Sequence, residues 1–283
     1  MVKRAITKIK PRQKDTHKGD YGHVFILAGS LGMTGAAYLA SQSALLSGSG
    51  LVTLGIPKSL NAIMEMKLTE VMTLPLEETA EQSLSSACEK KVLDFAARAD
   101  VLAIGPGISG NSDTQKLVRN LVKKSDKPVV LDADGINAYK DFTDELKIRK
   151  APLVITPHPG EMSRVAKMSA EEIQKDRQTL AKRFSSEYNA VVVLKGFQTV
   201  VAGEDELYVN ENGNPGMATG GAGDILTGMI ASLIGQGLNL FGAAKLASYV
   251  HGVAGDLAMR EQGEISLIAA DILHKLPAAF KGL

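Results

Sequence analysis

The chain has 283 residues, of which 45% are hydrophobic and 22% charged, a composition typical of one globular α/β domain. Its net charge of +1 disfavours nucleic acid as the main partner, because nucleic-acid-binding proteins concentrate positive charge. The single cysteine, Cys88, excludes an intrachain disulfide, and no catalytic motif surrounds it. The basic N-terminus lacks the apolar segment of a secretory signal, and no run reaches the roughly 18 apolar residues of a membrane span. We therefore expect a cytoplasmic protein without a membrane partner.

Short apolar runs recur along the first two thirds of the chain, and most end at a glycine or a turn. Uninterrupted apolarity, without alternation, is typical of strands that are covered on both faces. Helical patterns over 35–48, 113–124 and 170–188 lie between them, so the sequence predicts a mostly parallel sheet covered by helices. The predicted strands are Val24–Ala28, Leu51–Ile56, Val101–Ile104, Pro128–Leu131, Pro152–Ile155 and Ala190–Leu194.

The pattern changes after the last of these strands. The segments Gln198–Ala202 and Glu206–Val209 flank the polar turn Gly203–Asp205, which predicts a β-hairpin. The glycine-rich loop Gly213–Gly223 follows.

Three helices are predicted after the glycine-rich loop, the later two over about 243–259 and 267–280. The apolar residues of the first recur every four positions, which predicts one buried stripe. These residues are Ile225, Leu226, Met229, Ile230, Leu233 and Ile234. No repeat, linker or break in composition interrupts the chain, so we predict one domain over residues 1–283.

The helix expected over Gly35–Ser47 contains no charged residue. A helix without a charged face is usually covered on most sides. One side can pack on the sheet through Leu39 and Leu46. The other side can be covered by a neighbouring subunit, which would place Ala40 and Ser43 in an interface, or by the chain's own C-terminal helices.

The strongest signal for function is the segment Ala218–Asp224, directly before the buried helix. Glycine backbones and a helix N-terminus together make an anion site suited to phosphate. A carboxylate beside that site repels phosphate, so Asp224 is better suited to act as a general base for an attacking hydroxyl than to bind phosphate. The alternative is that Asp224 only caps the helix and that the glycines only form a tight loop.

Lys195 follows a buried strand and is expected at the carboxyl edge of the sheet, where ligands of open α/β folds bind. An ammonium group there can neutralise nucleotide phosphates, or it can simply be solvated. His158 lies between two prolines after another buried strand and is either a substrate contact or a structural residue.

Three further glycine- or aspartate-rich turns follow predicted strands. Gly105 and Gly107 offer bare backbone to a ligand. Asp132 and Asp134 can hold Mg²⁺ through water or cap the next helix. The turn Gly29–Gly35 superficially resembles a dinucleotide-binding turn, but its glycine spacing is wrong for one. The histidines show no spacing typical of a zinc site.

Taken together, the motifs resemble the NAD(P)H-hydrate dehydratase family, the carbohydrate-kinase-like domain of the ribokinase superfamily. The resemblance runs from His17 to about Asp271 and implies a ribokinase-like three-layer sandwich. A lone GAGD would indicate only the superfamily, whereas several fixed motifs in one order are specific. These motifs are HKGDYG, AGSLGMTGAA, GPG, LDADGIN, TPHPGE, VVVLKGFQT, NGNPGMATGGAGD and YVHGVAGD.

The resemblance also implies an activity and a set of site residues. Members of the family use ADP or ATP to dehydrate the 6-hydroxylated forms of NADH and NADPH, with Mg²⁺ as the implied metal and a homotetramer as the usual assembly. By resemblance, Asp224 is the catalytic base and Gly221, Ala222 and Gly223 form the anion hole. The nucleotide would be bound by Lys195, Gly196, Phe197, Gln198, Thr199 and Gly223. The hydrated nicotinamide nucleotide would be bound by Ala36, Gly105, Gly107, His158 and Asp224.

One departure from many bacterial members concerns the N-terminus. About sixteen residues precede HKGDYG, too few for the epimerase domain that often precedes this one, so we expect a dehydratase without an epimerase domain. Two alternative functions remain. One is a small-molecule kinase of the same superfamily, acting on a vitamin precursor such as hydroxyethylthiazole, and the other is a nucleotide-binding regulatory protein without catalysis.

Overall fold

The computed structural model describes residue 9 and residues 11–283. Most of the basic N-terminal segment, for which the sequence indicates no secretory signal, lies outside the described residues. Within the described part of the chain, nine strands form one sheet in the order β3-β2-β1-β4-β5-β6-β7-β8-β9. The strands are β1 (His23–Leu27), β2 (Leu51–Pro57), β3 (Met72–Leu76), β4 (Val101–Ile104), β5 (Val129–Leu131), β6 (Leu153–Ile155), β7 (Val191–Leu194), β8 (Val200–Ala202) and β9 (Leu207–Val209).

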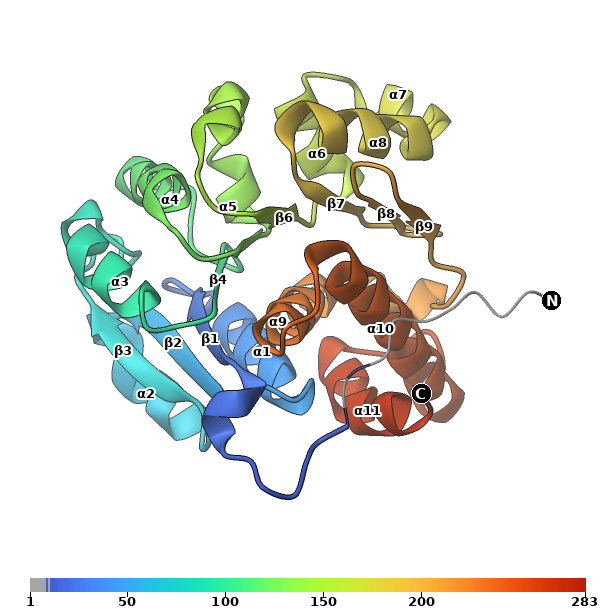
Figure 1. Ribbon diagram of the computed structural model, residues 1–283, viewed down its shortest axis with the longest axis horizontal. Helices are drawn as coiled ribbons and strands as arrows, with labels where there is room; N and C mark the ends of the chain where they lie inside the picture. The colour runs from blue at the N-terminus through green and yellow to red at the C-terminus, as the bar shows by residue number, and fades with distance from the viewer. Residues whose placement is uncertain (1–8, 10) are drawn as a thin grey trace.

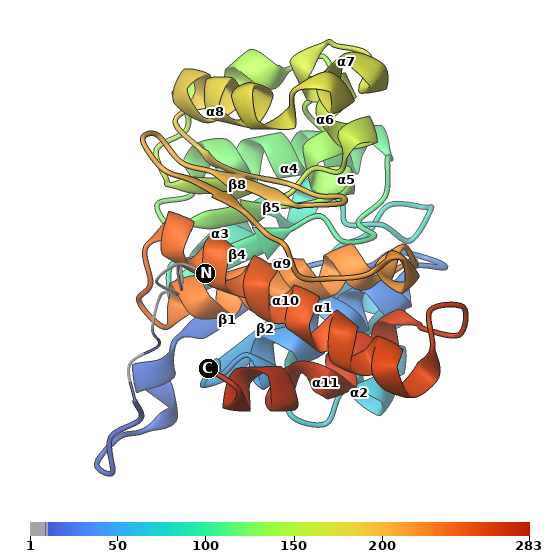
Figure 2. The same ribbon diagram turned by 90° about the vertical axis from the view of Figure 1, so that its right-hand side faces the viewer.

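Helices cover both faces of the sheet, which makes the three layers visible in Figures 1 and 2. The helices are α1 (Thr34–Leu46), α2 (Asn61–Lys67), α3 (Glu89–Ala96), α4 (Ser112–Lys124), α5 (Asp134–Asn137), α6 (Pro159–Ala166), α7 (Ala170–Lys175), α8 (Arg177–Tyr188), α9 (Ala222–Gly235), α10 (Leu240–Gln262) and α11 (Ala269–Lys281). One hydrophobic core lies between the sheet and α1, α2, α9, α10 and α11. A second lies on the opposite face, beneath α3, α4, α6 and α8.

The strand β1 shows why the apolar runs do not alternate with polar residues. Val24 and Ile26 enter the first core, whereas Phe25 and Leu27 enter the second, and all four side chains are fully buried. Since both faces of a central strand are covered, every position along it is apolar. All six predicted strands are present, and β1 to β7 are parallel, as predicted. The predicted hairpin is confirmed as the antiparallel pair β8–β9.

The charge-free helix α1 is covered by its own chain. It packs against α9, α11 and β2, and the side chains of Ala40 and Ser43 are fully buried there. The contact with α9 is close enough that a Cβ atom on Gly228 would lie 2.0 Å from the carbonyl oxygen of Ala40. The hypothesis that Ala40 and Ser43 lie in a subunit interface is therefore wrong, because the C-terminal helices of the same chain fill that place.

The helix α9 is more deeply buried than one apolar stripe requires. Besides the six predicted apolar residues, Thr227, Gly228, Ala231 and Ser232 are also buried, because α1, α10 and the sheet surround the helix. Among the described residues, no helix is both long and apolar enough to cross a membrane.

Candidate functional site

The candidate residues gather at the carboxyl edge of the sheet, beside its topological switch point. After β1 the chain moves outward to β2 and β3 and then returns to β4, so the strand order reverses between β1 and β4. The loops after these two strands are joined there. The Gly29 N–H donates to the Pro106 carbonyl at 2.8 Å, and the Ser30 hydroxyl donates to the Gly107 carbonyl at 2.8 Å. Ligands of open α/β sheets bind in the crevice at such a point.

The predicted anion hole lies at the N-terminus of α9. Gly221 is the N-cap residue, with φ of 96°, and a Cβ atom on it would lie 2.5 Å from Cδ1 of Leu39 in α1. Only glycine fits this position without strain. The first amides of α9 point out of the helix without intrahelical acceptors, and the helix dipole adds partial positive charge. An anion site formed by Gly221, Ala222 and Gly223 stays a prediction, and the Ala222 amide donates to the Thr219 carbonyl at 3.5 Å.

Asp224 is the third residue of α9, next to these amides. The pKa of its carboxyl group is raised to about 7, first by burial and then by the negative charge of Asp132, against the opposing effect of Lys195. A carboxyl group with this pKa is half deprotonated near neutral pH. That state suits a group that must accept a proton from a hydroxyl.

Lys195 lies beside the anion hole, 17% exposed. Its ammonium nitrogen would be 3.1 Å from a Cβ atom on Gly223, so the lysine and the first turn of α9 face the same space. Nζ lies 2.7 Å from Oδ1 of Asp132 and 3.8 Å from Oε2 of Glu161. Burial alone would lower the pKa of Lys195, but the two carboxylates outweigh it and raise that pKa. Lys195 is therefore a paired cation at the sheet edge, and not a solvated one.

The loop after Lys195 is held by a residue that sequence reasoning missed. Arg177, at the start of α8, donates to the carbonyls of Leu194 at 2.7 Å and Lys195 at 3.0 Å, and also to that of Phe197. The Phe197 side chain is 87% exposed. Because Arg177 is the first residue of a helix at the surface, the sequence around it does not indicate a contact with this distant loop. The predicted nucleotide-binding loop thus has a fixed backbone and a free aromatic side chain.

His158 is the N-cap of α6, and its Nδ1 accepts hydrogen bonds from the amides of Gly160 and Glu161. Burial lowers the pKa of His158, and Lys195 and Arg164 lower it further, so the imidazole is neutral near pH 7. Since Nδ1 accepts, the proton is on Nε2, 3.3 Å from Oε1 of Glu161. His158 therefore has a structural role as the N-cap of α6, and its contact with a substrate stays a prediction.

The remaining predicted substrate residues come from the loop after β4 and from α1. A Cβ atom on Gly107 would lie 3.1 Å from Cβ of Ala36, so these two residues are neighbours. A Cβ atom on Gly105 would lie 1.8 Å from the carbonyl oxygen of Asp132. The close approach of the residue after β5 therefore explains why a glycine is required at position 105. Contact of Gly105 with a ligand also stays a prediction.

The two aspartates weighed as metal ligands are occupied otherwise. Asp132 accepts hydrogen bonds from Lys195, Thr156 and Thr227, each at 2.7 Å. Asp134 is the first residue of α5, and its carboxylate accepts from the Ser109 amide. In the part of the chain that the structure describes, no group of three or more His, Cys, Asp or Glu residues is arranged to hold a metal ion. These residues do not form a preformed Mg²⁺ site.

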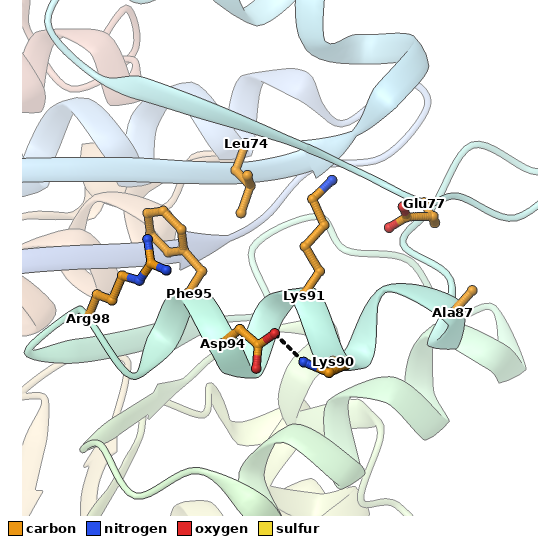
Figure 3. A pocket seen from close by; sticks show the side chains of 8 residues that line it. All are labelled: Leu74, Glu77, Ala87, Lys90, Lys91, Asp94, Phe95 and Arg98. Atoms are coloured by element: carbon orange, nitrogen blue, oxygen red, sulfur yellow. Dashed lines mark hydrogen bonds and ion pairs between the residues drawn. The ribbon is translucent and has the colours of Figure 1, made fainter.

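Other sequence features lie away from this edge. The motif HKGDYG precedes β1, at the opposite end of the sheet, where the Tyr21 and Gly22 carbonyls accept from the amides that lead into β2. A cavity of about 400 Å³ between β3 and α3 is lined by charged helix residues and a few apolar ones (Figure 3). None of the candidate residues lines it. Cys88 is fully buried, and burial raises its pKa to about 12, so it remains a thiol in the core.

Comparison with known proteins places this geometry in a family. The profile of the NAD(P)H-hydrate dehydratase family matches residues 24–278. The chain is 45% identical to a bifunctional NAD(P)H-hydrate repair enzyme of Moorella thermoacetica over 98% of its own length and 52% of that protein. It is 36% identical to an ADP-dependent (S)-NAD(P)H-hydrate dehydratase of Neisseria meningitidis, over 93% of this chain and 85% of that one.

A solved structure gives the same result. The ADP/ATP-dependent NAD(P)H-hydrate dehydratase of Bacillus subtilis, crystallised with ATP and Mg²⁺, superimposes with a TM-score of 0.80 and 31% identity. The match covers 96% of this chain and 93% of that one. The fold is ribokinase-like, as predicted. The chain spans about half the length of the bifunctional relative and 85% of the single-activity one. On these grounds the chain belongs to the NAD(P)H-hydrate dehydratase family.

Proposed function

We propose that this protein uses ADP or ATP to dehydrate the 6-hydroxylated forms of NADH and NADPH, and so restores the reduced cofactors. The observation that carries the proposal is the position of Asp224. A carboxyl group with a pKa near 7 stands in the first turn of α9, next to amides that can hold a phosphate and beside the ammonium group of Lys195. The family match over residues 24–278 supplies the substrate class.

The first half of the reaction is a phosphoryl transfer. The Asp224 carboxylate takes the proton of the C6 hydroxyl, and the oxygen attacks the terminal phosphorus of the nucleotide. The bond from that phosphorus to the leaving nucleotide oxygen breaks. The α9 amides from Gly221 to Gly223 and the Lys195 ammonium stabilise the negative charge of the transferring group. Hydroxide is a poor leaving group, and the new phosphate ester is a good one.

The second half is an elimination. The lone pair of the ring nitrogen forms a double bond to C6 while the C6–O bond to phosphate breaks. Loss of a proton from C5 then gives the C5–C6 double bond of the reduced nicotinamide, and inorganic phosphate leaves. This half needs little from the protein beyond holding the ring, for which we propose Ala36, Gly107 and His158. Mg²⁺ would be held mainly by nucleotide phosphates and water, as is usual for this ion.

A product assay tests the proposal directly. The protein is incubated with hydrated NADH, Mg²⁺ and either ADP or ATP, and reduced nicotinamide absorbance and inorganic phosphate are followed together. A dehydratase yields both in equal amounts. Accumulation of a phosphorylated substrate without phosphate release would indicate a small-molecule kinase. Tight nucleotide binding without any turnover would indicate a regulatory protein.

The variant Lys195→Ala is expected to weaken nucleotide binding by about 10–100-fold, the range for losing a charged hydrogen-bonding group. Binding of the hydrated cofactor should change less, because Lys195 faces the anion hole. Calorimetric titration with each ligand measures both. The melting temperature should also fall, because Asp132 and Glu161 lose their cation. Lys90→Ala, at an exposed ion pair, is the matched control. An equal or larger loss for the hydrated cofactor would place Lys195 on the substrate side.

We also propose a homotetramer, on the ground of the family resemblance. The interface does not involve Ala40 or Ser43, which are buried inside the subunit. Light scattering at micromolar concentration is expected to give four times the chain mass of 30.0 kDa. A mass of 30.0 kDa under these conditions would contradict any oligomer.

A further inference from the structure

A buried carboxylate joins four elements at the centre of the candidate site. Asp132 follows β5 and is 1% exposed. Its Oδ1 accepts hydrogen bonds from Lys195 Nζ and Thr156 Oγ1, and its Oδ2 accepts from Thr227 Oγ1, all at 2.7 Å. These donors follow β7, follow β6 and lie in α9, respectively. Charge-assisted hydrogen bonds of this length are among the strong ones in proteins.

Two of these donors belong to the phosphate-binding part of the site. Lys195 lies against Gly223 at the anion hole. Thr227 is one helical turn beyond Gly223 and also lies 3.2 Å from the Gly223 carbonyl oxygen. Asp132 therefore connects the predicted phosphate-binding lysine to the helix that supplies the phosphate-binding amides.

The same geometry rules out two simpler roles for Asp132. A carboxylate whose two oxygens accept three short hydrogen bonds, with 1% exposure, has no face open to a substrate or to a metal ion. Its effect on the reaction must act through its neighbours.

We propose that Asp132 is a positioning residue that fixes Lys195 and the first turns of α9 relative to each other, and that its buried charge acts on Asp224 in the first turn of that helix. This inference rests on the proposed function. It also has a consequence that does not depend on turnover, because the charge of Asp132 acts on the carboxyl group of Asp224 in the free protein.

The electrostatic surroundings of Asp224 give the sign of this effect. After burial, Asp132 is the largest cause that raises the pKa of Asp224, while Lys195 opposes it. The imidazoles nearby are neutral, since burial lowers the pKa of His158 and lowers that of His251 in α10 to about 4. The charged groups acting on Asp224 are Asp132, Lys195, Glu161 and Asp134. Removing the charge of Asp132 leaves Lys195 less opposed, so the pKa of Asp224 should fall.

The first test is Asp132→Asn, which removes the charge and keeps the size. Asp224 must be deprotonated to act, so wild-type kcat/KM should fall as the pH drops through about 7. In the variant this acidic limb should move to lower pH by about half a unit or more. Asp100→Asn, at the opposite edge of the sheet, is the control and should leave the limb in place. If a folded Asp132→Asn enzyme loses kcat/KM over the same pH range as the wild type, the proposed effect of the Asp132 charge on Asp224 is overturned.

The second test separates position from charge. Thr227→Val removes the hydrogen bond from α9 and leaves the charge of Asp132, so kcat should fall by about tenfold or more with the limb unmoved. Thr227→Ser keeps the hydroxyl group and should restore kcat. Thr143→Val, which removes a buried hydroxyl bonded to two carbonyls elsewhere, controls for lost stability. Wild-type kcat in Thr227→Val would overturn the positioning part, and this pair remains informative if Asp132→Asn does not fold.

A measurement without turnover distinguishes this inference from the proposed function. The Asp224 carboxyl resonance, assigned by its loss in Asp224→Asn, is titrated by ¹³C NMR in the wild type and in Asp132→Asn. A lower pKa in the variant supports the inference even if the wild type proves inactive on hydrated NADH. An unchanged pKa contradicts it even if the dehydratase activity is confirmed.

Discussion

Asp224→Asn is expected to lower kcat by about 10²–10⁴-fold, the usual effect of losing a general acid–base group. Asparagine has nearly the same shape but does not take a proton from a hydroxyl. The helix α9 and the amides of its first turn should be unaffected, because the N-cap is Gly221 and not Asp224. Nucleotide affinity should therefore stay the same, or rise slightly because a negative charge near the phosphates is removed.

The measurement is a steady-state assay of purified variants with hydrated NADH, together with calorimetric titration of the nucleotide. In the wild type, the rate should rise as the pH increases through about 7, because the carboxyl group is then deprotonated. Asp126→Asn, an exposed aspartate in the turn before β5, is the control and should behave as the wild type. Near-normal turnover of a folded Asp224→Asn enzyme would exclude Asp224 as the base.

Gly228→Ala is expected to destabilise the contact between α1 and α9. A Cβ atom at this position would lie 2.0 Å from the Ala40 carbonyl oxygen and 2.2 Å from Oγ of Ser43. The helices α1 and α9 would have to separate, and overpacking of a buried contact typically costs about 1–3 kcal/mol, occasionally more. The higher helix propensity of alanine offsets about 1 kcal/mol of this. The net cost of up to about 2 kcal/mol should lower the melting temperature by a few degrees, up to roughly 8 °C.

Gly35→Ala is the matched control for Gly228→Ala. It lies in the same helix pair, in the first turn of α1, and nothing lies within 4 Å of the position that its Cβ atom would take. Its melting temperature, followed by circular dichroism, should equal or exceed that of the wild type. A Gly228→Ala protein as stable as the wild type would mean that α1 and α9 adjust to the added methyl group at little cost.

The sequence predicted the central strands well because their environment is uniform. Residues of β1, β4, β5, β6 and β7 are covered on both faces, so each strand is a continuous apolar run. The strand β3 was missed because it is an edge strand, contains Pro75 and is partly exposed. The predicted helix over 170–188 is two helices, since Asp176 has a non-helical backbone conformation, with φ of −150° and ψ of 79°, and caps α8 by accepting from the Thr179 amide.

The sequence also predicted which motifs lie together at the carboxyl edge of the sheet. Motifs at strand ends lie together because parallel strands end at one edge, and this applies to Gly107, His158 and Lys195. The contacts of Asp132 with Thr156, Lys195 and Thr227 were missed, because they join residues 24, 63 and 95 positions apart. No local pattern encodes a pairing over such distances. The role of Arg177 was missed for the same reason.

These separations have a consequence for synthesis on the ribosome, which proceeds from the N-terminus. Asp132 leaves the ribosome long before Lys195 and Thr227, the donors that neutralise and hold it in the finished protein. Until Lys195 is made, the Asp132 carboxylate is more stable in water, because burying an unpaired charge is costly; the hydrogen bond from Thr227 forms only after α9 is made. A nascent chain that ends before α9 therefore lacks both the amides proposed to hold phosphate and the proposed base. The proposed phosphoryl transfer requires a chain translated at least through α9.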